Sequence, residues 1–197
     1  MKYTIKKGHQ CWQPHSIFPS VLSDFNELIW TVTPHASMEF DYEYEGELDA
    51  DWADWKKIGG ISLVNWKNLQ NLFVKNKDAI MMAHRWNPTI GVHEFAVYEN
   101  DRGKNIAYER PDQLLRTIAG TRISMKLVKV HARRYKAFLY VTSNGPDSVN
   151  SFIINTRQVF TMYSLINPWY GGANNAPGPW GGAAPRDMEM EIQFGKF

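Results

Sequence analysis

The chain has 197 residues, and its 22 basic and 20 acidic residues give a formal net charge of +2. This near balance provides no broad electrostatic field, so neither a nucleic acid nor a membrane is expected as a partner. A single cysteine excludes an intrachain disulfide and a thiolate metal cage. Aromatic residues make up 14% of the chain, with eight Trp among them, which favours an all-β class.

The start of the chain carries basic residues but no apolar stretch long enough for a signal peptide. No later segment is long and apolar enough to span a membrane. We therefore expect a cytoplasmic protein, or a virion protein that reaches the exterior through lysis. Because the chain contains no linker, repeat or low-complexity segment, residues 1–197 are predicted to form one domain.

The first alternating segment lies at Met38 to Tyr44, where apolar and aromatic residues take one face of a predicted strand. Glu39, Asp41 and Glu43 take the other face. Their E-x-D-x-E spacing resembles the catalytic motif of the laminarinase and lichenase glycoside hydrolases. The resemblance implies that Glu39 is a nucleophile, Asp41 its supporting carboxylate and Glu43 the general acid/base.

A solvated acidic face is the alternative interpretation of the same carboxylates. Positions four apart on a flat strand are separated by about 13 Å, whereas a retaining hydrolase needs carboxyl groups about 5 to 5.5 Å apart. The acidic residues also continue through Asp54, as a solvated face would. Asp49 to Asp54 could offer oxygen ligands to calcium, but this segment lacks the glycine and the bidentate glutamate of a loop-type site and favours an acidic turn.

No other metal, cofactor or nucleophile pattern is found. The six histidines show none of the short helical spacings of a zinc site, and His93 and Glu94 are expected on opposite faces of a strand. No Ser or Cys lies in a nucleophile elbow, and the paired glycines beginning at Gly59 lack the phosphate-loop pattern. No metal and no cofactor are therefore inferred.

Short strands joined by turn formers are predicted through the middle of the chain, and roughly ten to twelve strands are expected overall. They include Ala79 to Trp86, Val92 to Tyr98, Lys104 to Glu109, Ala137 to Thr142 and Gln158 to Leu165. At most one short helix is allowed, either near Trp66 to Phe73 or after Pro111.

A further predicted strand begins at Arg122, and its alternation slips in phase after Leu127, which indicates a β-bulge. Its outer face is basic, whereas the faces at Glu39 to Glu43 and Glu189 to Glu191 are acidic, so these strands are expected to be neighbours. Tyr135 and the cations around it could stack on single-stranded nucleic acid. The near-neutral total charge favours the alternative that these cations form the outer face of a strand and lie opposite acidic side chains.

The end of the chain is a Gly-rich, Pro-rich and aromatic loop followed by a strictly alternating strand. Met188, Met190, Ile192 and Phe194 fall on one face of this strand and are predicted to be buried. In the loop, Trp169, Tyr170 and Trp180 could stack on sugar rings or anchor a protein interface. The alternative is that these rings plug the open end of the sandwich.

Four segments now support a resemblance: DWKKIGGISL at 54–63, AIMMAHRWNP at 79–88, NPWYGGANNAP at 167–177 and APRDMEMEI at 184–192. Their order is similar to that in concanavalin A-like sandwich proteins of Bacteroidetes-type bacteria and their phages. Arg186 stands where those proteins usually have His, and residues 178–182 lengthen the terminal loop. The resemblance implies a two-sheet antiparallel jelly-roll-like sandwich and little about activity.

These observations lead to a functional hypothesis with one rival. The leading hypothesis is a non-enzymatic, lectin-like interaction module, most plausibly an accessory or structural protein of a phage particle. Its partners would be a protein scaffold, copies of itself or a glycan, bound by Trp169, Tyr170, Trp180 and Arg186. The rival is a glycoside hydrolase that uses Glu39 and Glu43.

Overall fold

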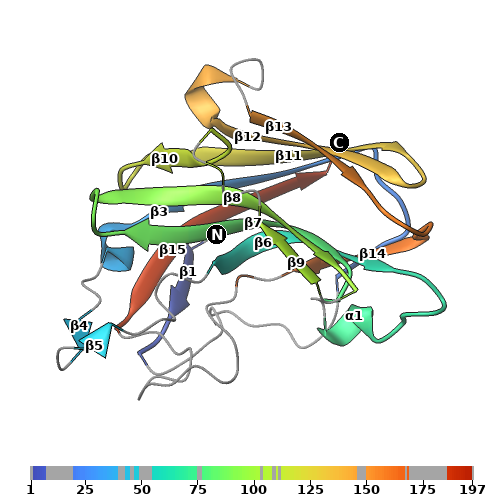
Figure 1. The fold of residues 1–197 in the computed structure, drawn as a ribbon, viewed down its shortest axis with the longest axis horizontal. Coiled ribbons are helices and arrows are strands. Elements are labelled where there is room, and N and C mark those ends of the chain that lie inside the picture. The colour runs from blue at the N-terminus through green and yellow to red at the C-terminus, as the bar shows by residue number, and fades with distance from the viewer. Residues whose placement is uncertain are drawn as a thin grey trace.

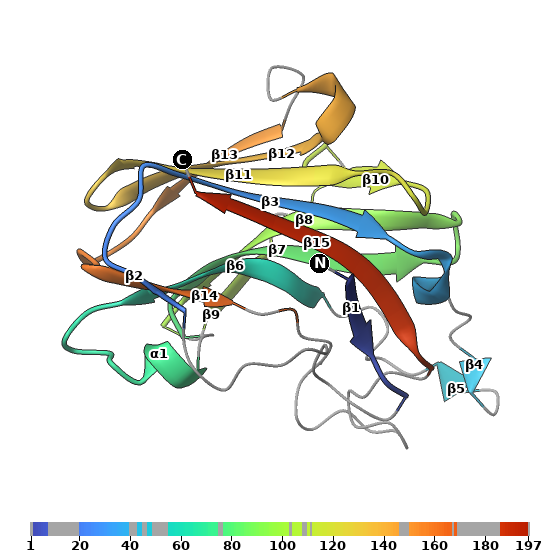
Figure 2. The ribbon, with the colours of Figure 1, turned by 180° about the vertical axis from the view of Figure 1, so that it is seen from behind.

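The fold is an all-β sandwich of two antiparallel sheets, which lie one above the other in Figures 1 and 2. The structure is a computed structural model that describes residues 2–7, 20–39, 43–44, 47–48, 55–74, 77–102, 104–107, 110, 112–145, 150–166, 168 and 186–196. This architecture confirms the predicted fold class and fits the concanavalin A-like sandwich that the sequence resembles.

One layer is a six-stranded sheet with the strand order β1-β15-β3-β11-β12-β13. Its strands are β1 (Lys2–Ile5), β15 (Met188–Lys196), β3 (Glu27–Pro34), β11 (Ile123–His131), β12 (Arg134–Val141) and β13 (Asn150–Asn155). The last strand of the chain therefore lies between the first strand and β3.

The other layer is a seven-stranded sheet with the order β10-β8-β7-β6-β14-β2, in which β9 also pairs with β8. Its strands are β10 (Leu115–Thr117), β8 (Val92–Asp101), β7 (Ala79–Asn87), β6 (Lys56–Val64), β14 (Met162–Ile166), β2 (Val21–Leu22) and β9 (Lys104–Ala107). The predicted meander of three strands is confirmed as β7, β8 and β9.

Short elements complete the described chain. They are a two-stranded ribbon of β4 (Glu43–Tyr44) and β5 (Glu47–Leu48), the 3-10 turns η1 (Ala36–Met38) and η3 (Thr142–Asn144), and the α-helix α1 (Asn71–Val74). Within the described part of the chain, α1 is the one α-helix, in agreement with the expectation of at most one short helix. No helix there is long and apolar enough to cross a bilayer.

The main core lies between the two sheets and follows from the alternation of side chains along each strand. On β3, Leu28, Trp30 and Val32 point inward and are buried, while the residues between them are only partly buried. Met188, Met190 and Ile192 of β15 are buried as predicted. The centres of the Phe194 and Trp30 rings are 5.3 Å apart, but Phe194 keeps 42% of its surface exposed. Its predicted burial is therefore only partial.

The central strands of the seven-stranded sheet are buried on both faces. The inner face joins the main core, and the outer face carries a second apolar cluster that includes Trp55, Met81, Tyr98 and Ile166. Burial on both sides explains why β7 begins with a continuous apolar run instead of an alternating pattern.

Two adjacent glycines allow close packing on the two sides of β6. A Cβ at Gly59 would lie 2.7 Å from Cδ1 of Trp30, so the bare backbone makes room for the indole. Gly60 has a φ of +145°, which side chains rarely adopt, and it pairs with Met81 in the middle of the sheet. The pairing of β6 with β7 also shifts register between Lys57 and Gly59. The glycines therefore have a packing role.

Several predicted strands have different bounds in the structure. A strand was predicted to begin at Met38. In the structure Met38 is the last residue of the 3-10 turn η1, and Glu39 lies outside any strand. The strand predicted from Gln158 begins only at Met162. β13 was not predicted, because its sequence alternates over only six residues between turn formers. The bulge in β11 is confirmed but falls between Lys129 and His131, later than the phase slip indicated.

The strand neighbours that were predicted from charge are wrong. β3 separates β15 from β11, so the acidic face of β15 does not adjoin the basic face of β11. Lys126 of β11 pairs instead with Glu27 of β3 at 2.5 Å. Glu189 pairs with Lys2 of β1 at 2.9 Å. Surface ion pairs contribute little energy, so their pattern was a weak guide to strand order.

Candidate functional site

Three charged side chains form a row across the outer face of the seven-stranded sheet, where β10, β8 and β7 lie side by side. Glu94 stands opposite Arg116 in one strand pair and opposite Arg85 in the other. Its Oε1 accepts from Arg116 Nε at 2.9 Å, and its Oε2 accepts from Arg85 Nε at 2.8 Å. We call these three residues the arginine row.

The carboxylate at the centre of the arginine row is buried, while the cations reach the surface. The Glu94 side chain is 1% exposed, compared with 21% for Arg85 and 41% for Arg116. Burial raises the pKa of Glu94, but hydrogen bonds from Arg116 and Arg85 outweigh burial and bring the pKa below its usual value. Glu94 is therefore ionised at neutral pH, and the three side chains together carry one net positive charge.

Aromatic rings and another cation lie on the same outer face. The Arg85 guanidinium lies 4.3 Å from the centre of the Trp55 ring. The Lys57 ammonium lies 4.9 Å from the centre of the Tyr98 ring. Such cation–π contacts orient the cations without neutralising their charge. Both rings are buried, so among the described residues this face combines positive charge with aromatic side chains that support the cations from below.

A second polar cluster lies inside the sandwich, on the opposite face of the same strands. His84 Nε2 is 2.8 Å from His93 Nδ1, and His93 Nε2 is 3.2 Å from Oε1 of Glu39. Because a carboxylate only accepts, His93 donates from Nε2 to Glu39 and accepts from His84 at Nδ1. We call this arrangement the histidine chain. It confirms that His93 and Glu94 occupy opposite faces of one strand.

Burial keeps the two histidines of the histidine chain neutral. His84 is fully buried, and its Nδ1 atom has no hydrogen-bond partner within the described structure. Burial first, and then the charges of His93 and Lys56, hold the pKa of His84 well below its usual value. Burial also lowers the pKa of His93, although the hydrogen bond to Glu39 opposes this effect.

Replacement of His84 by Gln tests the neutral state of the chain. A Gln amide can still donate to His93 but cannot titrate, so we expect the free energy of unfolding to depend less on pH. In the wild type, the unfolded chain takes up the proton below about pH 6.5, so stability is full above this pH and falls by up to about 1.4 kcal/mol per pH unit below it. Urea unfolding between pH 5 and 8 measures both slopes.

The comparison variant for this experiment is His131→Gln, which removes an exposed histidine from the end of β11. The pH dependence of this variant should match that of the wild type. If His84→Gln also keeps the wild-type slope, the buried histidine does not control acid stability.

The described structure holds two of the residues that the sequence singled out for function. Glu39 accepts from His93 at the edge of the core. Arg186 is exposed, and its Nε donates to the carbonyl oxygen of Ser37 at 2.9 Å. For Glu43 only the backbone, in β4, is described. Asp41, Trp169, Tyr170 and Trp180 lie outside the described residues, so the catalytic and the aromatic hypotheses stay predictions.

Comparison with known proteins gives a structural likeness. Neither a protein-family profile nor a curated protein matches the sequence. Among solved structures, the fold is similar to that of a double mutant of the alginate lyase Aly36B in complex with alginate trisaccharide, with a TM-score of 0.56 and 14% identity. The match covers 100% of this chain and 81% of the other. At this identity the likeness shows the shared sandwich fold alone.

Sequence reasoning missed the arginine row, although one signal for it was present. The turn formers between β7 and β8 set the hairpin register, and this register places Arg85 opposite Glu94. Nothing in the sequence placed Arg116 on the neighbouring strand.

Within the described residues, no group of three His, Cys, Asp or Glu side chains could hold a metal ion.

Proposed function

We propose that this chain is a carbohydrate-binding β-sandwich protein whose ligand is an acidic glycan, bound at the arginine row. The observation that carries the proposal is the pair of guanidinium groups that share one buried carboxylate. Their net positive charge at the edge of a sheet suits the carboxylate of a uronic acid.

The fold supports the same class of ligand. The alginate lyase that shares this sandwich was solved with an alginate trisaccharide, which is a polyuronate. In this chain the buried Trp55 and Tyr98 rings pack against the Arg85 and Lys57 cations and help to orient them. Guanidinium groups that are held in place in this way suit the carboxylates of an acidic sugar chain.

Arg116 is the residue expected to contact the ligand, because its side chain is the most exposed of the arginine row. Its Nε holds Glu94, which fixes the direction of the guanidinium before a ligand arrives. Such preorganisation lowers the entropy that binding would otherwise cost.

The test is the substitution Arg116→Gln, measured by calorimetric titration with polygalacturonate and with alginate oligosaccharides. A hydrogen bond to a charged group contributes about 1.5 to 3 kcal/mol, so the affinity should fall about tenfold or more. Wild-type affinity should also weaken as salt rises from low to physiological concentration, because the interaction is largely electrostatic.

The matched control is Arg134→Gln, which removes an exposed arginine from the six-stranded sheet. Its affinity should equal that of the wild type. Equal affinities for Arg116→Gln and Arg134→Gln, or no binding of either polyuronate, would contradict the proposal.

The same incubations separate binding from catalysis. A non-enzymatic module leaves both polymers intact, whereas a lyase would release unsaturated uronates that absorb ultraviolet light. The alternative glycoside hydrolase would release reducing ends from a neutral β-glucan, and Glu39→Gln would abolish that activity. The assignment to a phage particle and the binding of a scaffold stay predictions.

A further inference from the structure

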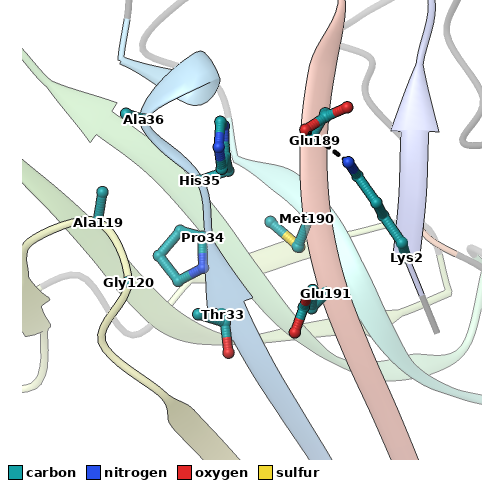
Figure 3. Close-up of a pocket in the computed structure, with 10 residues that line it drawn as sticks. All are labelled: Lys2, Thr33, Pro34, His35, Ala36, Ala119, Gly120, Glu189, Met190 and Glu191. Carbon is teal, nitrogen blue, oxygen red and sulfur yellow. Dashed lines mark ion pairs between the residues drawn. The ribbon is translucent and has the colours of Figure 1, made fainter.

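A cavity of about 430 Å³ opens on the outer face of the six-stranded sheet (Figure 3). The arginine row lies on the other sheet. Residues of β1, β15 and β3 and a turn after β10 line the cavity. They are Lys2, Thr33, Pro34, His35, Ala36, Ala119, Gly120, Glu189, Met190 and Glu191. We call it the β3–β15 pocket. Its volume lies within the range of about 300 to 1,000 Å³ that is usual for small-ligand sites.

Strand register fixes the polar side chains of the pocket. Glu191 stands opposite Lys2 on one side and opposite Thr33 on the other, so these three form a row across three strands. Glu189, one pleat along β15, pairs with the Lys2 ammonium at 2.9 Å, as the dashed line in Figure 3 shows. Alternation along the strands therefore brings carboxylates, an ammonium and a hydroxyl to one surface.

The hydrogen bonds of His35 fix the tautomer of its neutral ring. The backbone N–H of Ser37 donates to His35 Nδ1 at 3.1 Å, so this nitrogen is the acceptor and Nε2 carries the proton of the neutral ring. The Ser37 hydroxyl lies 3.0 Å from the same Nδ1 and accepts from the backbone N–H of Glu189. His35 thus contributes a defined N–H donor to the lining of the pocket.

Apolar groups form the rest of the wall. Ala36 and Ala119 provide methyl groups, and the buried Pro34 lies beneath them. The backbone N–H of Gly120 donates to the carbonyl of Pro34 at 2.9 Å, which ties the turn to the end of β3. The wall is therefore held in place by the sheet.

We propose that the β3–β15 pocket binds a neutral saccharide. Two carboxylates outnumber one ammonium among the carboxylate and ammonium groups of the described lining, and this excess of negative charge disfavours an anionic sugar. Acceptors and donors stand side by side, and a ring with several hydroxyl groups satisfies both kinds. The methyl groups of Ala36 and Ala119 match the apolar C–H face of such a sugar.

This site is separate from the arginine row in position and in charge, so the inference does not depend on the proposed acidic ligand. The experiment is an NMR titration of ¹⁵N-labelled protein with lactose, maltose and mannobiose, each at up to tens of millimolar. Sodium glucuronate is the charged comparison. At least one neutral disaccharide should produce saturable shifts at the Gly120 and Glu191 amides, with about tenfold weaker binding of glucuronate.

Two variants test whether the pocket itself binds. Ala119→Trp should fill the cavity and abolish the shifts, whereas Ile118→Trp, on the neighbouring exposed residue, should retain them. Glu191→Gln, which keeps the shape of the side chain, should weaken binding about fivefold or more. It tests the site even if Ala119→Trp does not fold. Arg116→Gln should leave neutral-sugar binding unchanged.

Three results would overturn the proposal. They are the absence of saturable shifts with all three neutral disaccharides, equal binding of glucuronate, and saturable binding that survives in both Glu191→Gln and Ala119→Trp.

Discussion

Substitution of Gly60 by Ala should be among the most destabilising single changes in this chain. A Cβ at this position would meet the carbonyl oxygen of Ile80 and lie 2.7 Å from Cα of Met81, both of them backbone atoms that cannot turn aside. The φ of +145° adds strain for any L side chain. We expect the free energy of unfolding to fall by about 3 kcal/mol or more. Urea denaturation at neutral pH measures it.

Gly91→Ala separates the effect of backbone strain from that of steric overlap with neighbouring atoms. Gly91 also has a positive φ, of +65°, but a Cβ there would meet no atom within 4 Å. Its replacement should therefore cost only the backbone strain of about 1 to 2 kcal/mol. Similar losses in the two variants would show that the close approach of β6 to β7 does not constrain the fold.

Glu94→Gln should be the second large effect, because it removes the charge at the centre of the arginine row. The variant leaves two guanidinium groups without their shared counter-ion, and loss of one partner of a buried pair costs about 3 to 5 kcal/mol. Since Arg85 and Arg116 are partly exposed, water can replace some of the interaction. We therefore expect a loss of about 2 kcal/mol, measured by urea unfolding at pH 7.

The pH dependence provides an independent check on Glu94. Because the folded pKa is lowered, the carboxylate stabilises the fold above the unfolded value of about 4.5. This contribution is lost as the pH falls through the folded pKa. The difference between wild type and Glu94→Gln should thus shrink on acidification. Glu189→Gln, at an exposed ion pair, is the matched control and should change the unfolding midpoint little.

Alternation predicted the strands that bury one face only. β15 was recognisable because apolar and polar residues alternate along it, and Met188, Met190 and Ile192 are indeed buried. Glu27–Pro34 carries the same signal and forms β3, although it was not predicted. β6 shows no alternation, because both its faces are covered and two glycines interrupt the pattern. Strand order depended on long-range packing and could not be predicted from charge.

The functional surfaces were harder to predict than the fold. Glu94 and Arg116 are 22 positions apart in the sequence, and only the pairing of β8 with β10 brings them together. The β3–β15 pocket combines residues from both ends of the chain with a turn near its middle. No local motif marks either surface. For Glu39 the situation is reversed. A local motif suggested a catalytic role, whereas the structure places this residue against a buried histidine.

The position of β15 between β1 and β3 has a consequence for synthesis in the cell. While the ribosome is still translating, the edges of β1 and β3 that β15 later covers have no partner, and such edges invite pairing with other chains. The six-stranded layer can be completed only after Lys196 has left the exit tunnel. Folding of this layer therefore depends on contacts between residues that are far apart in the sequence. Chaperone dependence and inclusion bodies in rapid expression are the practical outcomes to expect, and slower translation at low temperature should improve the yield.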